Sequence, residues 1–236
     1  MLLEISNLDV ILSGLHILQD VSLHVNEGEL VVVAGANGSG KSTLLRTVMG
    51  MNRPQAGTIK FRENGIGGAV SHTIIGRGLC LVAEGRQLFR GLTARENLRL
   101  GAYHYRRDKK RVEANLEKVY AMFPVLKENE GRIASTFSGG EQQMIAIGQG
   151  LMSEPALMMI DELSLGLAPM IIESLFRVIK DLNRGGISIL LIEQNVRQSL
   201  QIADRAYVLE NGKVILSGTG KELLDNPVVR EAYLGL

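Results

Sequence analysis

Two kinds of apolar pattern along the chain predict two kinds of β-strand. Val21, Leu23 and Val25 alternate with polar residues, and residues 57–61 form a second segment of this kind. Such alternation is typical of an antiparallel sheet that buries one face. Continuous apolar runs instead predict parallel strands that are covered on both faces. These runs span residues 30–34, 79–83, 157–160 and 187–192.

The segments between the apolar runs predict an α/β core with an insertion. Helical patterns separate most of the runs, and strands joined in this way form a parallel sheet with right-handed crossovers. From about residue 93 to residue 153 the pattern is helical without a convincing strand, which indicates a helical subdomain inserted into that core. Asn211-Gly212 between two apolar runs predicts a β-hairpin. A final helix is expected over residues 221–233, with a break near Pro227.

Composition narrows the classes of protein that these elements can form. The 236 residues, 45% of them hydrophobic, are enough for one large domain with a core. The net charge of +1 argues against a strongly basic nucleic-acid-binding protein, and the basic run of residues 104–111 is interpreted as the solvent-exposed start of a helix. No apolar run approaches the ~18 residues of a membrane span, and the N-terminus lacks the pattern of a signal peptide. The single cysteine, Cys80, favours a reducing compartment and a core position.

Eight residues that follow the first continuous apolar run fit the pattern G-x-x-x-x-G-K-[ST] of a phosphate-binding loop. They are Gly35, Ala36, Asn37, Gly38, Ser39, Gly40, Lys41 and Ser42. The glycines let backbone N–H groups point at phosphate oxygens, and the start of the following helix adds positive potential. Lys41 is expected to reach the β- and γ-phosphates, and the hydroxyl of Ser42 is expected to bind Mg²⁺. A glycine-rich turn without a ligand is the alternative.

Two adjacent carboxylates follow the apolar run of residues 157–160. A strand that ends in Asp161 and Glu162 is the Walker B arrangement of phosphate-loop enzymes. Asp161 is expected to hold Mg²⁺ through its water shell, because this ion prefers hard oxygen ligands. Glu162, at the tip of the strand, is expected to orient or deprotonate the attacking water. The alternative is a strand followed by an acidic turn.

A second glycine-containing segment opens a later helix. Ser138 and Glu141 form the S-x-x-E pattern of a capping box, and Gly139 and Gly140 leave the first turn without side chains. A well-capped helix is one explanation. Bare N–H groups, a hydroxyl and the positive end of the helix also suit a second anion site. Because one chain already has a phosphate-binding loop, a second γ-phosphate site indicates that two chains share each nucleotide.

In this order and spacing, the three motifs resemble those of the nucleotide-binding subunit of an ATP-binding cassette (ABC) transporter, over essentially the whole chain. Residues 35–43, ending at Thr43, match Walker A, residues 138–142 match the signature motif, and residues 161–162 match Walker B. The resemblance implies the α/β fold of a P-loop NTPase, with an N-terminal antiparallel β-subdomain and the inserted α-helical subdomain. It implies a single nucleotide-binding domain over residues 1–236.

Within the superfamily the likeness is strongest to the subgroup that takes up branched-chain amino acids. The segments that carry this likeness are residues 84–89, 138–144, 164–169, 193–195 and 231–235. The resemblance implies the ATPase subunit of an importer, peripheral on the cytoplasmic face of the inner membrane, with ATP and Mg²⁺ as ligands.

Several partners are also implied by the resemblance. They are a second ABC ATPase subunit, identical or paralogous, the transmembrane permease subunits and, indirectly, a periplasmic or extracellular substrate-binding protein. A groove beside residues 84–97 and the helical insertion is implied to receive a permease helix. No nucleic acid is expected as a partner.

Three candidate site residues are among the positions that depart from the pattern of most ABC cassettes. Glu84 stands where glutamine is usual and can contact Mg²⁺ or water, although a surface ion pair with Arg86 is an alternative. Gln194 stands where histidine is usual and can hydrogen-bond a γ-phosphate without carrying a proton. The subgroup accommodates both replacements. Leu12 stands where an aromatic ring usually stacks on adenine, so apolar contact without stacking is expected there.

Three other functions share some of these features. A soluble, non-transport cassette protein that acts on DNA or ribosomes is disfavoured by the near-neutral charge and by a single cassette without a long coiled-coil insertion. An importer of urea, another amide or a different amino acid would have the same motifs, because the binding protein and the permease choose the substrate. A nucleotide sensor with negligible turnover would fit the residues at positions 12, 84 and 194.

Overall fold

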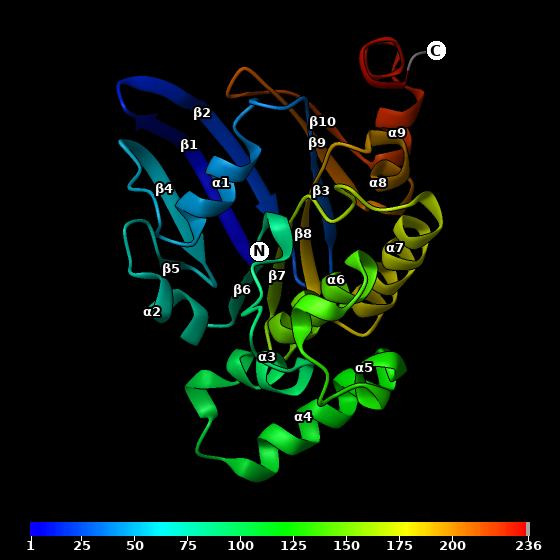
Figure 1. Cartoon of the computed structure of the whole chain (residues 1–236). Helices are drawn as coiled ribbons and strands as arrows, with labels where there is room; N and C mark the ends of the chain where they lie inside the picture. The colour runs from blue at the N-terminus through cyan, green and yellow to red at the C-terminus, as the bar shows by residue number, and fades with distance from the viewer. Residues whose placement is uncertain (235–236) are drawn as a thin grey trace.

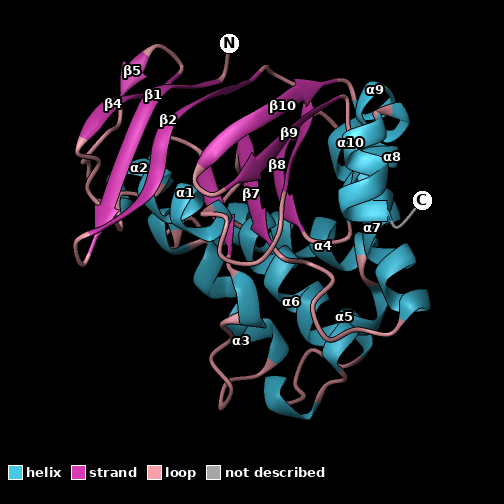
Figure 2. Ribbon diagram, turned by 90° about the horizontal axis from the view of Figure 1, so that it is seen from above, coloured by secondary structure: helices cyan, strands magenta, loops and turns pink. Residues whose placement is uncertain are grey.

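The computed structural model describes residues 1–234, and the chain folds into two β-sheets with helices around them (Figure 1). Seen from above, the strands gather on one side of the molecule and most helices on the other (Figure 2). Gly235, the last residue of the C-terminal segment that resembles the amino acid uptake subgroup, lies outside the described residues.

The smaller sheet is antiparallel and comes from the N-terminal part of the chain. Its order is β2-β1-β4-β5, and its strands are β1 (Leu3–Leu12), β2 (Leu15–Val25), β4 (Ala56–Phe61) and β5 (Asn64–Gly65). Alternating patterns predicted β2 and β4 but not β1. In β1, Asn7 takes a left-handed φ of 49°, and the pairing with β2 shifts between Ile5 and Leu8. This bulge moves the buried positions from odd to even residue numbers, so that β1 has no continuous alternation.

The larger sheet has the order β10-β9-β3-β8-β7-β6. Its strands are β3 (Leu30–Ala34), β6 (Leu79–Val82), β7 (Leu157–Asp161), β8 (Ser188–Glu193), β9 (Arg205–Glu210) and β10 (Lys213–Gly218). Neighbouring strands are parallel except β9 and β10, which form the hairpin predicted at Asn211-Gly212. Every residue of β3, β7 and β8 is buried, as the continuous apolar runs predicted.

Two hydrophobic cores meet at this sheet, one on each face. On one face, the antiparallel sheet, α1 (Lys41–Val48) and α2 (Ser71–Gly76) pack against side chains such as Val31 and Leu190. On the other face, α7 (Pro169–Arg184), α8 (Val196–Ile202) and the helices between β6 and β7 pack against side chains such as Val32 and Leu191. Successive residues of one strand enter different cores, because side chains alternate across a sheet.

Between β6 and β7 the regular elements of the described chain are all helical. The elements of this segment are η1 (Glu84–Arg86), α3 (Ala94–Gly101), η2 (Tyr103–Tyr105), α4 (Lys109–Met122), α5 (Pro124–Glu128), η3 (Ala134–Thr136) and α6 (Gly139–Leu151). Strand-like pairing within its described residues is confined to a bridge between Thr93 and Ile133. The basic run of residues 104–111 holds a helix start only at its end, because α4 begins at Lys109 with Asp108 as its cap.

The C-terminal helix expected over residues 221–233 is divided. It consists of α9 (Gly220–Asp225), α10 (Pro227–Val229) and a π-helical turn η4 (Arg230–Leu234). Asn226, between α9 and α10, has an extended backbone, the conformation favoured before a proline, and its side chain caps α10. The break predicted near Pro227 is confirmed.

The close packing of α3 on α6 gives a test of this fold. A Cβ atom at Gly101 would lie 1.9 Å from the carbonyl oxygen of Gln149. Gly101→Ala should therefore lower the free energy of unfolding by about 1–3 kcal/mol, the usual cost of overpacking. Gly76→Ala is the matched control, because a Cβ atom there would meet no atom within 4 Å. Urea denaturation measures both variants, and equal stabilities would contradict the close crossing of α3 and α6.

Candidate functional site

The phosphate-binding loop predicted from the sequence connects the end of β3 to the start of α1. Gly38 and Gly40 have φ angles of 79° and 106°, in the left-handed region that glycine adopts without strain. Gly35 lies outside this region but has no room for a side chain, because a Cβ atom there would lie 2.2 Å from the carbonyl oxygen of Leu209. The three motif glycines are thus required by geometry, Gly35 by close approach and the other two by backbone conformation.

The ammonium group of Lys41 lies inside this loop. Only 4% of the residue is exposed, and Nζ donates hydrogen bonds to the carbonyl oxygens of Gly35 at 2.8 Å and Ala36 at 2.9 Å. The Oε1 atom of Glu162 is 3.9 Å from Nζ. Burial lowers the pKa of Lys41, and the nearby carboxylates, Glu162 first among them, oppose this shift. Lys41 is therefore a partly desolvated cation placed to interact with anions.

Ser42 and Asp161 bring two oxygen ligands together from different elements. The hydroxyl of Ser42, in the first turn of α1, donates a 3.1 Å hydrogen bond to Oδ1 of Asp161 at the end of β7. Burial raises the pKa of Asp161, and the negative charges of Glu162 and Glu84 add to this shift. Two hard oxygens, one of them charged, fit Mg²⁺. No group of three or more His, Cys, Asp or Glu side chains that could hold a metal ion is found in residues 1–234.

Glu162 and Gln194 lie next to each other at the tips of β7 and β8. Nε2 of Gln194 donates a 2.7 Å hydrogen bond to Oε2 of Glu162, and the backbone N–H of Glu162 donates to the carbonyl oxygen of Ile192. Glu162 has a φ of 49°, a left-handed conformation that is unfavourable for a residue with a Cβ atom. The structure thus brings two of the predicted catalytic residues into direct contact.

Glu84 follows β6 as the first residue of η1. It is half-buried, and its negative charge acts on both Lys41 and Asp161. Among residues 1–234, no ion pair joins Glu84 to Arg86, and the guanidinium of Arg86 instead donates a 3.4 Å hydrogen bond to the carbonyl oxygen of Leu165. The position of Glu84 therefore favours a role in the acidic part of the site over a surface ion pair.

The capping box predicted at the start of α6 is confirmed. The Ser138 side chain accepts a hydrogen bond from the backbone N–H of Glu141, whose carboxylate accepts one from the N–H of Ser138. Ser138 is exposed, so this helix N-terminus is open to a partner. A Cβ atom at Gly139 would lie against Leu167, in the loop after β7, and against the guanidinium of Arg86 in η1. A Cβ atom at Gly140 would lie against Ile171 of α7.

Leu12 lies at the end of β1, opposite Leu15 of β2. It is half-buried and packs against the core beneath the antiparallel sheet. Part of its apolar surface remains accessible, and its contact with a nucleotide base stays a prediction.

Glu193, a fourth acidic residue of the site, was not predicted as a site residue. It is the last residue of β8, is 0% exposed, and accepts hydrogen bonds from the backbone N–H of Ser164 at 3.0 Å and from its hydroxyl at 2.7 Å. Burial raises the pKa of Glu193, and these hydrogen bonds oppose the shift. The signal that could have marked it is a carboxylate directly after the buried run of residues 187–192.

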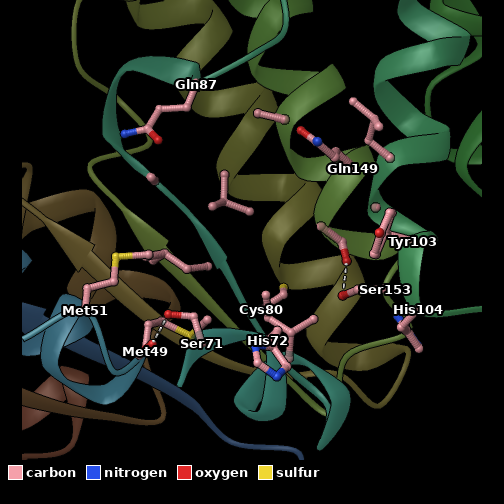
Figure 3. Close-up of a pocket in the computed structure, with 18 of the residues that line it drawn as sticks. Met49, Met51, Ser71, His72, Cys80, Gln87, Tyr103, His104, Gln149 and Ser153 are labelled. Atoms are coloured by element: carbon pink, nitrogen blue, oxygen red, sulfur yellow. Dashed lines mark hydrogen bonds between the residues drawn. The ribbon is translucent and has the colours of Figure 1, made fainter. Parts of the chain in front are cut away.

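A cavity of about 400 Å³ is lined by β6, by residues that follow α1 or belong to α2, and by α3, η2 and α6 (Figure 3). Met51 and Tyr103 lie on opposite sides of it and are 58% and 64% exposed. Arg86 and Gln87 bring the segment after β6 to its lining, which agrees with the groove expected beside residues 84–97. Cys80 also lines it, and burial raises the pKa of this thiol to about 12.

The relatives of this chain identify its family. The profile described as ABC transporter matches residues 18–164. The chain is 49% identical to the high-affinity branched-chain amino acid transport ATP-binding protein BraG of Pseudomonas aeruginosa, over 92% of this chain and 93% of that protein. It is 35% identical to the probable branched-chain amino acid transport ATP-binding protein LivF of Archaeoglobus fulgidus, over 94% of both chains.

Solved structures have the same fold. A nucleotide-free ATP-binding cassette from an ABC transporter is 26% identical with a TM-score of 0.87, over 100% of this chain and 99% of that chain. The ADP conformation of the cassette MJ1267 is 27% identical with a TM-score of 0.85, over the same shares. The chain belongs to the ABC transporter family. Within that family it is an ATP-binding cassette, a P-loop ATPase, which confirms the predicted fold class.

None of the helices within residues 1–234 has the length and apolarity needed to cross a membrane.

The buried charge of Asp161 predicts that its removal stabilises the free chain. The pKa of Asp161 is higher in the folded state than in the unfolded state. The contribution of this carboxyl to folding stability is therefore fully present below the unfolded-state pKa. It is lost as the pH rises through the folded-state pKa. Asp161→Asn should therefore raise the melting temperature at neutral pH, with about 2–4 °C corresponding to each kcal/mol of stability gained in a chain of this size. The gain should shrink at acidic pH, where the wild-type carboxyl is protonated.

Thermal unfolding of the nucleotide-free chain at neutral and acidic pH measures both effects. The exposed Asp225→Asn is the control and should change neither melting temperature. A lower melting temperature of Asp161→Asn at neutral pH would contradict the unfavourable burial of this charge.

Proposed function

We propose that this chain is the ATP-binding and ATP-hydrolysing subunit that powers the import of branched-chain amino acids through a separate membrane permease. The observation that carries the proposal is the 49% identity, over 92% of the chain, to a protein named for this transport. The geometry of the site supports the ATPase part, because a buried ammonium, a hydroxyl–carboxylate pair and a second carboxylate meet at one edge of the sheet.

The triphosphate of ATP is proposed to lie against residues 35–43. The N–H groups at the start of α1 and the ammonium of Lys41 would meet its oxygens, in place of the carbonyl contacts that Lys41 makes within its own loop. Leu12 is proposed to contact the base through apolar surface alone. Ser42 and Asp161, with Glu84 nearby, would hold Mg²⁺, which when bound neutralises charge on the phosphate oxygens.

Hydrolysis is assigned to Glu162 and Gln194. The carboxylate of Glu162 accepts the proton of the attacking water, and the amide of Gln194, which is hydrogen-bonded to that carboxylate, orients it. A glutamine side chain cannot take up a proton, so the role of general base falls to Glu162. Lys41 stabilises the negative charge of the phosphate oxygens during the reaction.

A second cassette, identical or paralogous, is proposed to complete each site. The exposed Ser138 and the N–H groups of Gly139 and Gly140 would contact the γ-phosphate held by the other chain, while Glu141 caps the helix. Hydrolysis would reopen the closed pair of cassettes.

Opening and closing of the two cassettes would drive the permease. A cytoplasmic segment of the permease is proposed to enter the cavity lined by Gln87 (Figure 3). The chain would then lie on the cytoplasmic face of the membrane as a peripheral subunit. A periplasmic or extracellular substrate-binding protein would meet only the permease.

Glu162→Gln should give a chain that binds ATP, barely hydrolyses it and accumulates as an ATP-dependent dimer. Lys41, Ser42 and Asp161 remain, so only the proton acceptor is lost. We expect turnover to fall by about 10²–10⁴-fold, the usual contribution of a general base. Phosphate release measures turnover, and size-exclusion chromatography with ATP, ADP or no nucleotide measures the dimer. Glu173→Gln, on the exposed surface of α7, is the control. Normal turnover by Glu162→Gln would contradict the mechanism.

Import is tested in cells that lack this chain and receive it on a plasmid. Uptake of radiolabelled leucine, isoleucine and valine should require the wild-type chain, and Lys41→Ala should abolish it, because the ammonium that meets the phosphates is lost. The chain should fractionate with membranes and permease. Restored uptake of urea instead, or copurification with nucleic acid, would show that the proposed substrate or the proposed class is wrong.

A further inference from the structure

The hydrogen bonds of Glu193 carry an inference that rests on the proposed function and deepens it. A fully buried carboxylate is stable only where hydrogen-bond donors satisfy its oxygens. Ser164 supplies two such donors to Glu193, its hydroxyl at 2.7 Å and its backbone N–H at 3.0 Å. The backbone N–H groups of Asn195 and Gln194 also lower the pKa of this carboxyl.

These donors come from the segments that carry the proposed catalytic groups. Ser164 stands two residues after Glu162, on the loop that follows β7, and Gln194 follows Glu193 directly. The side chain of Gln194 in turn donates to the carboxylate of Glu162. One buried carboxylate thus ties together the two strand ends from which the general base and its amide partner project.

The loop that Glu193 holds continues to the proposed contact with the second cassette. The carbonyl oxygen of Leu165 accepts the hydrogen bond from Arg86. Leu167 lies against Gly139, where a Cβ atom would be 3.2 Å from the Cδ2 atom of Leu167. A displacement of Ser164 would therefore change the surroundings of both Glu162 and Gly139.

We propose that Glu193 is a positioning residue for ATP hydrolysis, whose carboxylate fixes Ser164 and Gln194 so that Glu162 is held between Lys41 and Gln194. The left-handed φ of Glu162 is costly and persists only where its surroundings enforce it. The backbone hydrogen bond from Glu162 to β8 provides one restraint, and the clamp formed by Glu193 provides the other. Glu193 acts through these neighbours and does not touch the nucleotide.

A glutamine at position 193 keeps the shape of the side chain but not its hydrogen bonds. The amide nitrogen carries only N–H groups, so either it faces the backbone N–H of Ser164 or the Ser164 hydroxyl must reverse and accept from it. In both cases the charge-assisted hydrogen bonds to Ser164 are lost or replaced by weaker neutral ones. The substitution also removes a buried negative charge, which offsets part of the lost hydrogen bonding. Glu193→Gln should therefore fold normally while its loop is poorly fixed.

The test compares turnover with nucleotide affinity. Glu193→Gln should lower kcat by at least about tenfold, because small misplacements of catalytic groups are costly, while the KM for ATP changes less than about twofold. Binding of a fluorescent ATP analogue and the melting temperature should match those of the wild type. Ser164→Ala, which removes only the hydroxyl donor, should lower kcat by a smaller factor. The double variant should be no slower than Glu193→Gln, because both residues act through one contact.

Ser188→Ala is the matched control. It removes a buried hydroxyl at the opposite end of β8, where Ser188 accepts a hydrogen bond from the backbone N–H of Gly28. It should leave kcat unchanged.

The possible outcomes test the proposed ATPase function and the role of Glu193 separately. A wild-type chain without turnover would contradict the proposed ATPase function and this inference with it. An active wild type together with an equally active Glu193→Gln would overturn only the role of Glu193. Parallel loss of ATP affinity, stability and turnover in Glu193→Gln would show a general structural role and would also overturn it. Where Glu193→Gln does not fold, Ser164→Ala decides, and an unchanged kcat in that variant overturns the proposal.

Discussion

Three neighbouring parallel strands, β3, β8 and β7, end at the same level, and this register decides where the charged groups of the site lie. Ala34 pairs with Glu193, and Ile192 pairs with Asp161. The phosphate-binding loop and the polar residues that follow β7 and β8 therefore leave the sheet next to one another, at the edge where α/β proteins bind ligands. A shift of one residue in either pairing would turn every side chain to the opposite face. The apolar residues that fix the register thus also fix the chemistry.

The crowding of charge at this edge is unfavourable for the chain without its ligands. Burial and neighbouring carboxylates raise the pKa of Asp161, and burial lowers the pKa of Lys41. Such opposed shifts are typical of sites whose ligands supply the missing partners. In the proposed mechanism a polyanion and a divalent cation arrive together, so that each buried group gains a partner of opposite sign. The chain gives up some stability for this arrangement, as functional sites commonly do.

Local patterns were sufficient to predict the strands that position the site, whereas the hydrogen bonds that orient its side chains depend on contacts distant in sequence. β3, β7 and β8 could be predicted because both of their faces are buried, and the phosphate-binding loop because its glycines meet specific geometric needs. β1 was missed because the bulge at Asn7 changes the phase of its alternation. Glu193 was missed because its burial depends on Ser164, 29 residues away, and no spacing rule marks such a pair. Likewise, the contact between Gln194 and Glu162 required the two strands to be neighbours.

The burial of Cys80 has a practical consequence for labelling chemistry. Alkylating reagents react with the thiolate, and a thiol with a pKa of about 12 is protonated at neutral pH. The chain has no other cysteine, so a cysteine introduced at an exposed position would react selectively in the folded protein without a cysteine-free background. The Sγ atom of Cys80 lies 3.4 Å from where a Cβ atom of Gly150 would be, at the contact between β6 and α6. Its slow alkylation would therefore report local opening of the structure around β6, which makes the thiol an intrinsic probe of local unfolding.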